Sequence, residues 1–561
     1  MRTFRSRAIS ACAALVIIAV LVPTAGGPAY SQRRDAVSIG LAQEPDLLGP
    51  YTIMAVSGVI HNTVFGYISM FNDKWERVPI MAEKLPTLKD GDWVLLPNKR
   101  MKVTWKLKRG FTWHDGKPVT ALDWRFTYGA MRNPLAPPPS GGRFVLNKVD
   151  NVLVPNPNDP YEMVVQWNEL YPFAGSEPFD RAYPLPRHVL EAAYLRDPSK
   201  MKAHQNWRLP IGNGPYKMKE WAPGSHMTLE ANDKWPLGAP AIKTLTFRFI
   251  LDSTVLQANV LAGNVDASDI NNFNCLQMEQ IAQRNPRVNA HYREAMVWER
   301  IDFNLDDAWL KDKRVRQAIA HALDRKALAE ISCSGGRQPV AHSWLAPGHP
   351  AAHPNLKKYD YDVARARALL TEAGFTIGPD GFLRDATGKR AEMTISTTAG
   401  NSIREQIQQI LKEQLKQVGI DLRIDNRPAS VFFGTMVPRR QFTHLAMYAS
   451  LFTPESIPFD RFHTSQIPSQ ANGWEGNNRV GWRNAENDRL WEQLNSELDA
   501  QKRIALFRRQ QEIFADELPS VPLYFRLDLT TYPKAMRGPR PVGLGSYYLP
   551  WNSWEWKWGD L

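Results

Sequence analysis

Apolar and polar residues alternate along several short segments in the first half of the chain. Alternation with a period of two predicts half-buried strands, because successive side chains of a strand point to opposite faces. In 242–250, for example, Leu245, Phe247 and Phe249 share one face. By contrast, 133–142 is rich in Pro and Gly and predicts a loop. The predicted strands cover 36–41, 103–107, 161–167 and 242–250.

From about residue 300 the apolar residues recur at a spacing of three to four, which predicts amphipathic helices between strands. We expect Asp312, Asp362 and Ser402 to cap three of these helices, and Gly374 and Gly419 to end two of them. Helices that alternate with strands indicate α/β lobes. Further helices are predicted over 485–498 and 501–516, and further strands over 420–424 and 521–527.

The N-terminus has the pattern of an export signal. Arg2, Arg5 and Arg7 precede an apolar run over 8–22, and small residues follow at the positions that a signal peptidase reads. We therefore predict a cleaved signal peptide over 1–31 and a periplasmic location for the mature chain. The alternative is an uncleaved anchor helix, but 15 apolar residues are fewer than the roughly 20 that span a bilayer.

Composition narrows the classes of protein further. The 561 residues are 43% apolar and 11% aromatic, which allows a sizeable core and excludes a disordered chain. The formal charge of +12 is scattered along the sequence, so we expect no nucleic-acid partner.

Two cysteines remain after the predicted signal peptide, Cys275 and Cys333. In an oxidising compartment they can pair, or they can stay as buried thiols. Of these two alternatives we favour the thiols.

Motifs for catalysis or metal binding are missing from the sequence. It contains no GxxxxGK[ST], HExxH or GxSxG motif, and Asp306-Asp307 has no identifiable partner for catalysis. We therefore expect no enzyme, no metal site and no cofactor. The basic run Lys311, Lys313, Arg314 and Arg316 predicts a solvated helix face. An exported, aromatic-rich chain of this kind favours a binding protein with a pocket between its lobes.

Five segments, spread over nearly all of the mature chain, carry specific motifs. The first two are the segment 110–123, GFTWHDGKPVTALD, and the segment 212–216, GNGPY. The others lie at 301–325, 361–375 and 415–420. In this order they resemble the family 5 extracellular solute-binding proteins, which are the oligopeptide- and dipeptide-type receptors of ABC importers.

The resemblance implies an α/β fold of two lobes, of the type II-like periplasmic binding protein kind, with an extra inserted subdomain. It implies a monomer that captures a solute between its lobes and delivers it to an inner-membrane ABC permease with its ATPase. A peptide is the expected solute. The implied division is 32–78, 206–296 and 526–561 for the first lobe, 79–205 for the inserted subdomain and 297–525 for the second lobe.

One departure from the family pattern keeps other solutes open. Peptide-binding members hold the amino group of the peptide with an Asp, whose position here falls on Ser450 or, in an ungapped alignment, on Phe452. Neither is acidic, and a buried ammonium without a carboxylate is costly. Glu455 is a nearby substitute. The alternatives are a non-peptide solute such as an opine, an oligosaccharide or an aromatic compound, and, less favoured, a secreted hydrolase.

The resemblance also implies which residues line the cleft. Trp474 is a candidate for stacking on the ligand, as is Trp298, and each can equally be a core residue. The predicted ligand contacts are Glu44, Tyr448, Ser450, Phe452, Glu455, Trp474 and Tyr524.

Overall fold

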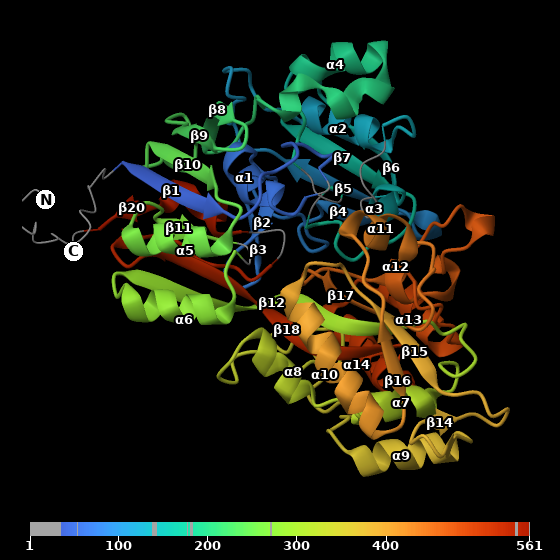
Figure 1. The fold of residues 1–561 in the computed structure, drawn as a ribbon. Coiled ribbons are helices and arrows are strands. Elements are labelled where there is room, and N and C mark those ends of the chain that lie inside the picture. The colour runs from blue at the N-terminus through green and yellow to red at the C-terminus, as the bar shows by residue number, and fades with distance from the viewer. Residues whose placement is uncertain are drawn as a thin grey trace, which may run out of the picture. The chain divides into compact units, whose positions relative to one another are not determined.

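A ten-stranded mixed sheet runs through the described part of the chain (Figure 1). Its two long central strands, β12 (Val288–Phe303) and β18 (Ser520–Pro533), pair antiparallel and connect its two halves. The other strands, in spatial order, are β16 (Asp421–Ile424), β15 (Glu392–Ser396) and β17 (Leu445–Leu451) on one side, and β11 (Ala267–Ser268), β1 (Ala36–Leu41), β10 (Thr244–Phe249), β9 (His226–Ala231) and β8 (Tyr216–Ala222) on the other.

The computed structural model describes most of the chain, and all the residues it describes belong to one unit, Arg33–Leu561. The predicted signal peptide and 137–142 of the predicted loop lie outside these residues. Among the described helices, none is long and apolar enough to cross a membrane. The described ranges are 35–52, 54–136, 143–176, 178–179, 183–269, 272–544 and 548–559.

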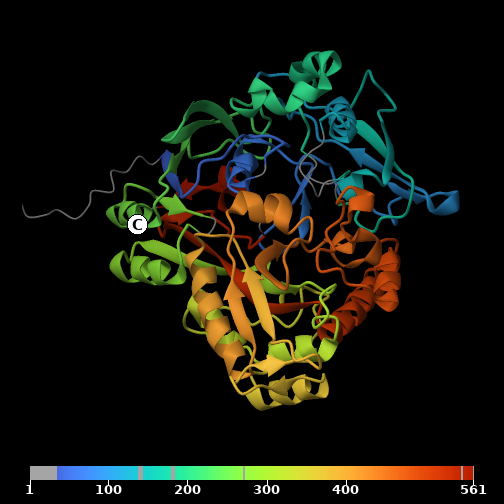
Figure 2. The same cartoon turned by 45° about the vertical axis from the view of Figure 1, so that its right-hand side comes forward.

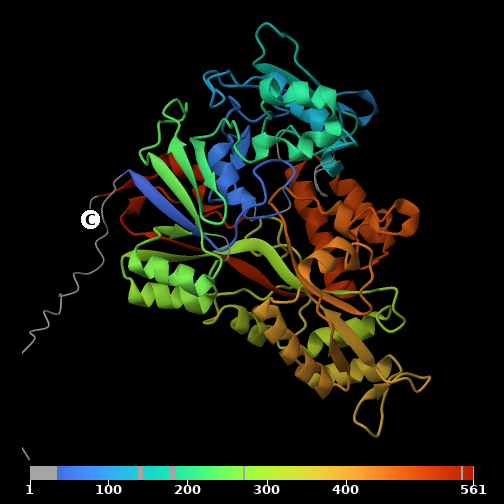
Figure 3. The same cartoon turned by 45° about the horizontal axis from the view of Figure 1, so that its top comes forward.

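The strands predicted from alternation form where expected. β1 has the predicted bounds, and in β10 the side chains of Leu245, Phe247 and Phe249 are buried. Two helices, α5 (Ser253–Ala262) and α6 (Cys275–Arg284), lie side by side near β1 and β10 (Figure 3).

A second, four-stranded antiparallel sheet lies within 79–205. It consists of β4 (Trp93–Leu95), β5 (Met101–Lys106), β7 (Glu162–Trp167) and β6 (Val149–Leu153), with the helices α2 (Ala121–Arg132) and α4 (Arg187–Arg196). Thr120 and Asp123 of the first motif form a capping box at the start of α2. This contact gives the Thr and Asp of the motif a structural role, because the box satisfies backbone donors at the helix end.

The first two motifs contact each other. His114 donates from Nε2 to the carbonyl of Gly214 (3.1 Å), and Gly212 donates its backbone N–H to Nδ1 of His114 (3.2 Å). Burial lowers the pKa of His114 to about 4, so the ring is neutral at pH 7 and can accept at one nitrogen and donate at the other. A Cβ on Gly214 would lie 2.6 Å from the carbonyl oxygen of Thr63, so only glycine fits there.

The predicted helices of the second half also form, and one of them is capped by a different residue than predicted. Asp312 and Asp362 accept hydrogen bonds from the first turns of α7 (Lys313–His321) and α9 (Val363–Glu372). Asn401 caps α10 (Ser402–Gln417), so the prediction of Ser402 was wrong by one residue. Figure 2 shows α10 beside the strands β15 and β16. The other long helices in this half of the chain are α8 (Arg325–Ser332), α13 (Ala485–Leu494) and α14 (Ala500–Glu517).

Cys275 and Cys333 form a disulfide, so the preference for thiols was wrong. Cys275 is the first residue of α6 and Cys333 directly follows α8. Their Cα atoms are 5.0 Å apart, within the range that a disulfide needs. The two segments meet in an apolar cluster that also contains Val288 and Leu527, a meeting that a separation of 58 residues in sequence does not reveal.

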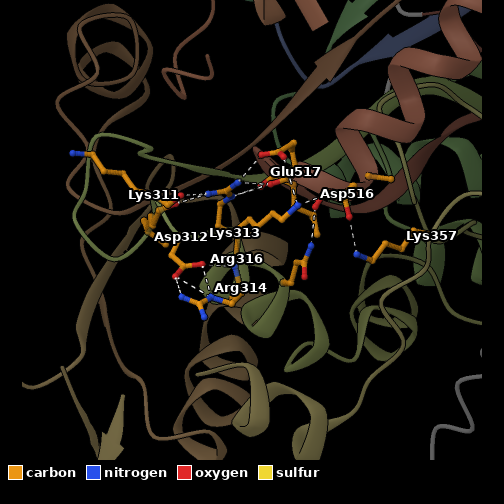
Figure 4. Close-up of polar contacts among 12 residues, drawn as sticks. Lys311, Asp312, Lys313, Arg314, Arg316, Lys357, Asp516 and Glu517 are labelled. Carbon is orange, nitrogen blue, oxygen red and sulfur yellow. Dashed lines mark hydrogen bonds and ion pairs between the residues drawn. The ribbon is translucent and has the colours of Figure 1, made fainter. Parts of the chain in front are cut away.

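The basic run at the start of α7 is solvated only in part (Figure 4). Lys313 and Arg314 are exposed and pair with Asp516 and Asp312. Arg316, however, is only 3% exposed, and its guanidinium donates to four backbone carbonyls, so its assignment to a solvated face was wrong. Those acceptors belong to Leu310, Lys311, Glu517 and Leu518.

The pairing of β12 with β18 is irregular at two points. The register shifts between the pairs Glu294–Leu527 and Trp298–Phe525, and again between Glu299–Tyr524 and Arg300–Pro522. The predicted lobe boundaries at 296/297 and 525/526 fall at the first of these irregularities. The division into lobes and an inserted subdomain at these positions stays a prediction.

Candidate functional site

The segment with the expected ligand contacts begins on β17. This strand pairs antiparallel with β12, which places Tyr448 opposite Arg300 and Ser450 opposite Trp298. After the strand, a loop leads to the short helix α12 (Phe459–Phe462), which carries Arg461. Strand pairing and this turn of helix therefore bring Arg300 and Arg461, from two other parts of the sequence, to Ser450.

Arginines surround the hydroxyl of Ser450. Arg300 donates from Nη1 to Ser450 Oγ at 2.7 Å, and Arg461 donates from Nη1 to the same oxygen at 2.8 Å. Arg479 is close enough for its charge to act on both Tyr448 and Arg461. We call Ser450, Arg300, Arg461 and Arg479 the Ser450 cluster.

Next to this cluster, the carboxylate of Asp302 accepts hydrogen bonds from three side chains. It accepts from Arg300 Nε at 2.6 Å, from the hydroxyl of Tyr448 at 2.5 Å and from Ser520 Oγ at 2.7 Å. The guanidinium of Arg300 also lies 4.2 Å from the ring centroid of Tyr448. Burial, and then the charge of Asp302, raise the pKa of Tyr448. Tyr448 thus supports Arg300 from within the protein.

A second buried charge network lies one residue earlier on β12. Glu299 is fully buried and accepts from Arg404 Nε at 2.8 Å and from Arg526 Nη2 at 2.6 Å. Burial alone would raise the pKa of Glu299, but Arg526 and Arg404 outweigh it and hold this pKa below its ordinary value. Because Arg526 belongs to β18 and Arg404 to α10, the network ties both elements to the central strands.

The two predicted acidic contacts are engaged within the protein, with partners outside the Ser450 cluster. Glu455 pairs with Arg77 at 2.6 Å and accepts from Ser176 Oγ at 2.8 Å. Glu44 accepts from the indole N–H of Trp221 at 2.8 Å and from the backbone N–H of Gly224 at 2.9 Å. Glu455 thus joins its loop to β3 (Arg77–Pro79), and Glu44 holds the turn between β8 and β9.

The predicted aromatic contacts divide into buried and half-buried residues. Phe452, Tyr524 and Trp298 are 4%, 2% and 1% exposed and belong to the apolar core. Trp474 is half-buried, in a loop with a left-handed backbone conformation (φ 64°). Among the predicted contacts, Ser450 is the one that lies in the cluster.

Sequence reasoning missed Arg300, Arg461 and Arg479. One available signal was the run WERIDF at 298–303, where charged residues interrupt a strand with buried apolar neighbours. Buried charges of this kind are usually paired or functional. Arg461 and Arg479 carry no such signal, because isolated arginines are ordinarily solvated.

Comparison with known proteins places this chain in a family. Residues 90–467 match the family described as bacterial extracellular solute-binding proteins, family 5 Middle, and the chain belongs to this family. The family consists of binding proteins that act outside the cytoplasm, as the sequence motifs predicted.

Individual relatives match almost end to end. The oligopeptide-binding protein AppA of Bacillus subtilis is 28% identical over 556 residues, which cover 95% of this chain and 96% of AppA. OppA of the same organism is 23% identical, with 93% of each chain covered. The structure of an oligopeptide-binding protein from Thermus thermophilus, complexed with a pentapeptide, matches with a TM-score of 0.78, 29% identity and coverage of 94% and 96%. The predicted two-lobed α/β fold is confirmed.

Proposed function

We propose that this protein is the exported binding component of an ABC importer and that it captures a peptide between its two lobes. One observation carries the proposal: the chain and its oligopeptide-binding relatives align over more than nine tenths of both lengths. The signal-peptide pattern over 1–31 supports export. The partner is an inner-membrane permease with its ATPase, which receives the solute from the monomeric binding protein.

The arrangement of the central strands supports capture by closure. β12 and β18 connect the two halves of the large sheet, and an irregularity in their pairing offers a place for bending. Of the predicted contacts, we propose that Ser450 and the half-buried Trp474 contact the solute. Glu44, Tyr448, Phe452, Glu455 and Tyr524 remain predictions, and their described contacts support a role in holding the surrounding elements.

The test is to identify what the protein carries. The chain is purified from the periplasm under native conditions and denatured, and the released compounds are analysed by mass spectrometry. A set of short peptides supports the proposal, whereas a single non-peptide compound overturns the peptide and keeps the receptor. Turnover of the bound compound would overturn the receptor itself. The N-terminal residue of the same preparation tests cleavage after residue 31.

A further inference from the structure

The three arginines of the Ser450 cluster carry more positive charge than the neighbouring carboxylates neutralise. Arg300 is paired with Asp302. Among the residues that the structure describes, no carboxylate forms an ion pair with Arg461 or Arg479. The guanidinium of Arg461 lies 5.4 Å from the ring centroid of Phe452 and donates to a neutral hydroxyl.

The nearest acid compensates only in part. Asp460 acts on the charge of Arg461, but its carboxylate accepts from Nδ2 of Asn477 at 2.6 Å, and its backbone carbonyl accepts the Asn477 N–H. Arg479 donates from Nη2 to Asn477 Oδ1 at 3.0 Å, and its buried Nε has no partner among the described residues. Burial lowers the pKa of Arg461; Asp460 opposes this, and Arg300 and Arg479 add to it.

This surplus contrasts with the other network on the same strand. Around Glu299, a fully buried carboxylate sits between two guanidiniums. Ser450 occupies the comparable place between Arg300 and Arg461, but its hydroxyl carries no charge. Since desolvated cations without an anion cost free energy, the Ser450 cluster is the place where an anion would be stabilised most.

The hydroxyl of Ser450 is oriented by the two arginines that donate to it. It accepts from two guanidiniums, which occupies both of its lone pairs and leaves its own proton to donate. No described residue accepts that proton in a hydrogen bond. Arg461 and Arg479 are half-buried residues, whereas Arg300 is only 5% exposed. The cluster thus offers donors and lacks an acceptor.

We propose that the Ser450 cluster binds a carboxylate of the captured solute. A carboxylate matches guanidinium groups because it is planar, can accept two parallel hydrogen bonds and supplies the missing negative charge. The inference rests on the proposed function, since it concerns the solute held by the same receptor. Two sources supply this group in a peptide, the C-terminus and an acidic side chain. An ammonium at this position is excluded by repulsion from the arginines.

The test compares solutes that differ only in this charge. The full mature chain is stripped of solute by reversible denaturation and dialysed against pools of di- to hexapeptides, one with free C-terminal carboxylates and one with C-terminal carboxamides. In each pool, peptides with Glu are matched by peptides with Gln, so that the two sources are distinguished. Bound peptides are quantified by mass spectrometry, and the dissociation constants of the best pair are measured by calorimetry.

The variants are Arg461→Gln and Arg479→Gln, with Arg248→Gln as the matched control. Arg248 is also half-buried, donates to a backbone carbonyl and forms no ion pair among the described residues, but it lies on β10. We expect Arg461→Gln to weaken binding of the carboxylate peptide about 10- to 100-fold, as for loss of a hydrogen bond between charged groups. Its affinity for the matched neutral peptide should be unchanged, and Arg248→Gln should change neither.

The possible failures are distinguishable. If the wild-type chain binds acid and amide peptides equally, or if Arg461→Gln weakens both alike, the carboxylate site is overturned while the receptor stands. If the wild-type chain binds no peptide and carries no solute from the periplasm, the proposed function falls, and the inference with it. Should Arg461→Gln fail to fold, Arg479→Gln and the wild-type preference for free acids still decide.

Discussion

Replacing Glu299 by Gln should destabilise the protein strongly, because it breaks a buried ion network without changing its shape. Glu299 is fully buried and accepts hydrogen bonds from Arg404 and Arg526 at 2.6–3.0 Å. The amide of Gln removes the negative charge that these two guanidiniums share. Breaking a buried pair from one side costs about 3–5 kcal/mol, since the remaining charges stay desolvated.

The magnitude can be measured as a change in the midpoint of thermal unfolding. For a mature chain of about 530 residues, 3–5 kcal/mol corresponds to a decrease of about 3–5 °C. The matched control is Glu372→Gln, which removes the same charge from an ion pair with Arg365 whose side chains are 50% and 48% exposed. Exposed pairs contribute about 0–1 kcal/mol, so the control should shift the midpoint by less than about 1 °C.

The effect of Glu299→Gln should also depend on pH in one direction. Because the pKa of Glu299 is lowered in the folded state, its charge stabilises the wild type above the unfolded-state pKa of about 4.3. This stabilisation is lost as the pH falls through the folded-state pKa, so the difference between wild type and variant should shrink in acid. Calorimetric midpoints at pH 7, 5 and 3.5 measure it. Equal midpoints for Glu299→Gln and Glu372→Gln at pH 7 would refute the reasoning.

Three further predictions concern other contacts. Glu455→Gln should lower the free energy of unfolding by about 1–3 kcal/mol in denaturant titrations, because it breaks a half-buried ion pair with Arg77; a loss no larger than that of Glu372→Gln would contradict this. Burial and Asp269 raise the pKa of Asp528 to about 7, so the wild type should lose stability as the pH rises from about 4 to 7. Asp528→Asn lacks this titration, so its midpoint of thermal unfolding should rise relative to that of the wild type over the same pH range. A difference in midpoint that does not depend on pH would argue against this. Reducing the Cys275–Cys333 disulfide, or replacing both residues by Ser, should cost up to about 4 kcal/mol for a separation of 58 residues, and unchanged unfolding would rule it out.

The sequence predicted elements better than it predicted their meeting points. β1 has its predicted bounds because alternation is a local property, and Asp312 caps α7 because capping involves only the next turn. The prediction of Ser402 as the cap of α10 failed because its neighbour Asn401 is an equally good cap, and only the backbone path decides between them. Local pattern is therefore sufficient for element type and insufficient where two equivalent residues compete.

Local sequence pattern did not predict the contacts between segments that are distant in the sequence. Arg316 lies in a basic run, yet two of its acceptors, Glu517 and Leu518, are about 200 residues away. Ser450 was selected by resemblance, but its neighbours Arg300 and Arg461 come from β12 and α12. The sequence alone does not show whether a charged residue is solvated or buried. The site could therefore be recognised only in the folded structure, which brings these residues together.

The disulfide between Cys275 and Cys333 gives the halves of the large sheet a covalent connection besides β12 and β18. Cys275 starts α6, which packs on β12, and Cys333 follows α8, which packs on β18. Two adjacent strands alone form a narrow ribbon, which can twist as easily as it bends. A tether fixed beside the ribbon resists twisting, so we expect opening and closing to follow one path. In the proposed receptor, every loaded molecule would then present the same docking geometry to the permease, whichever solute it carries.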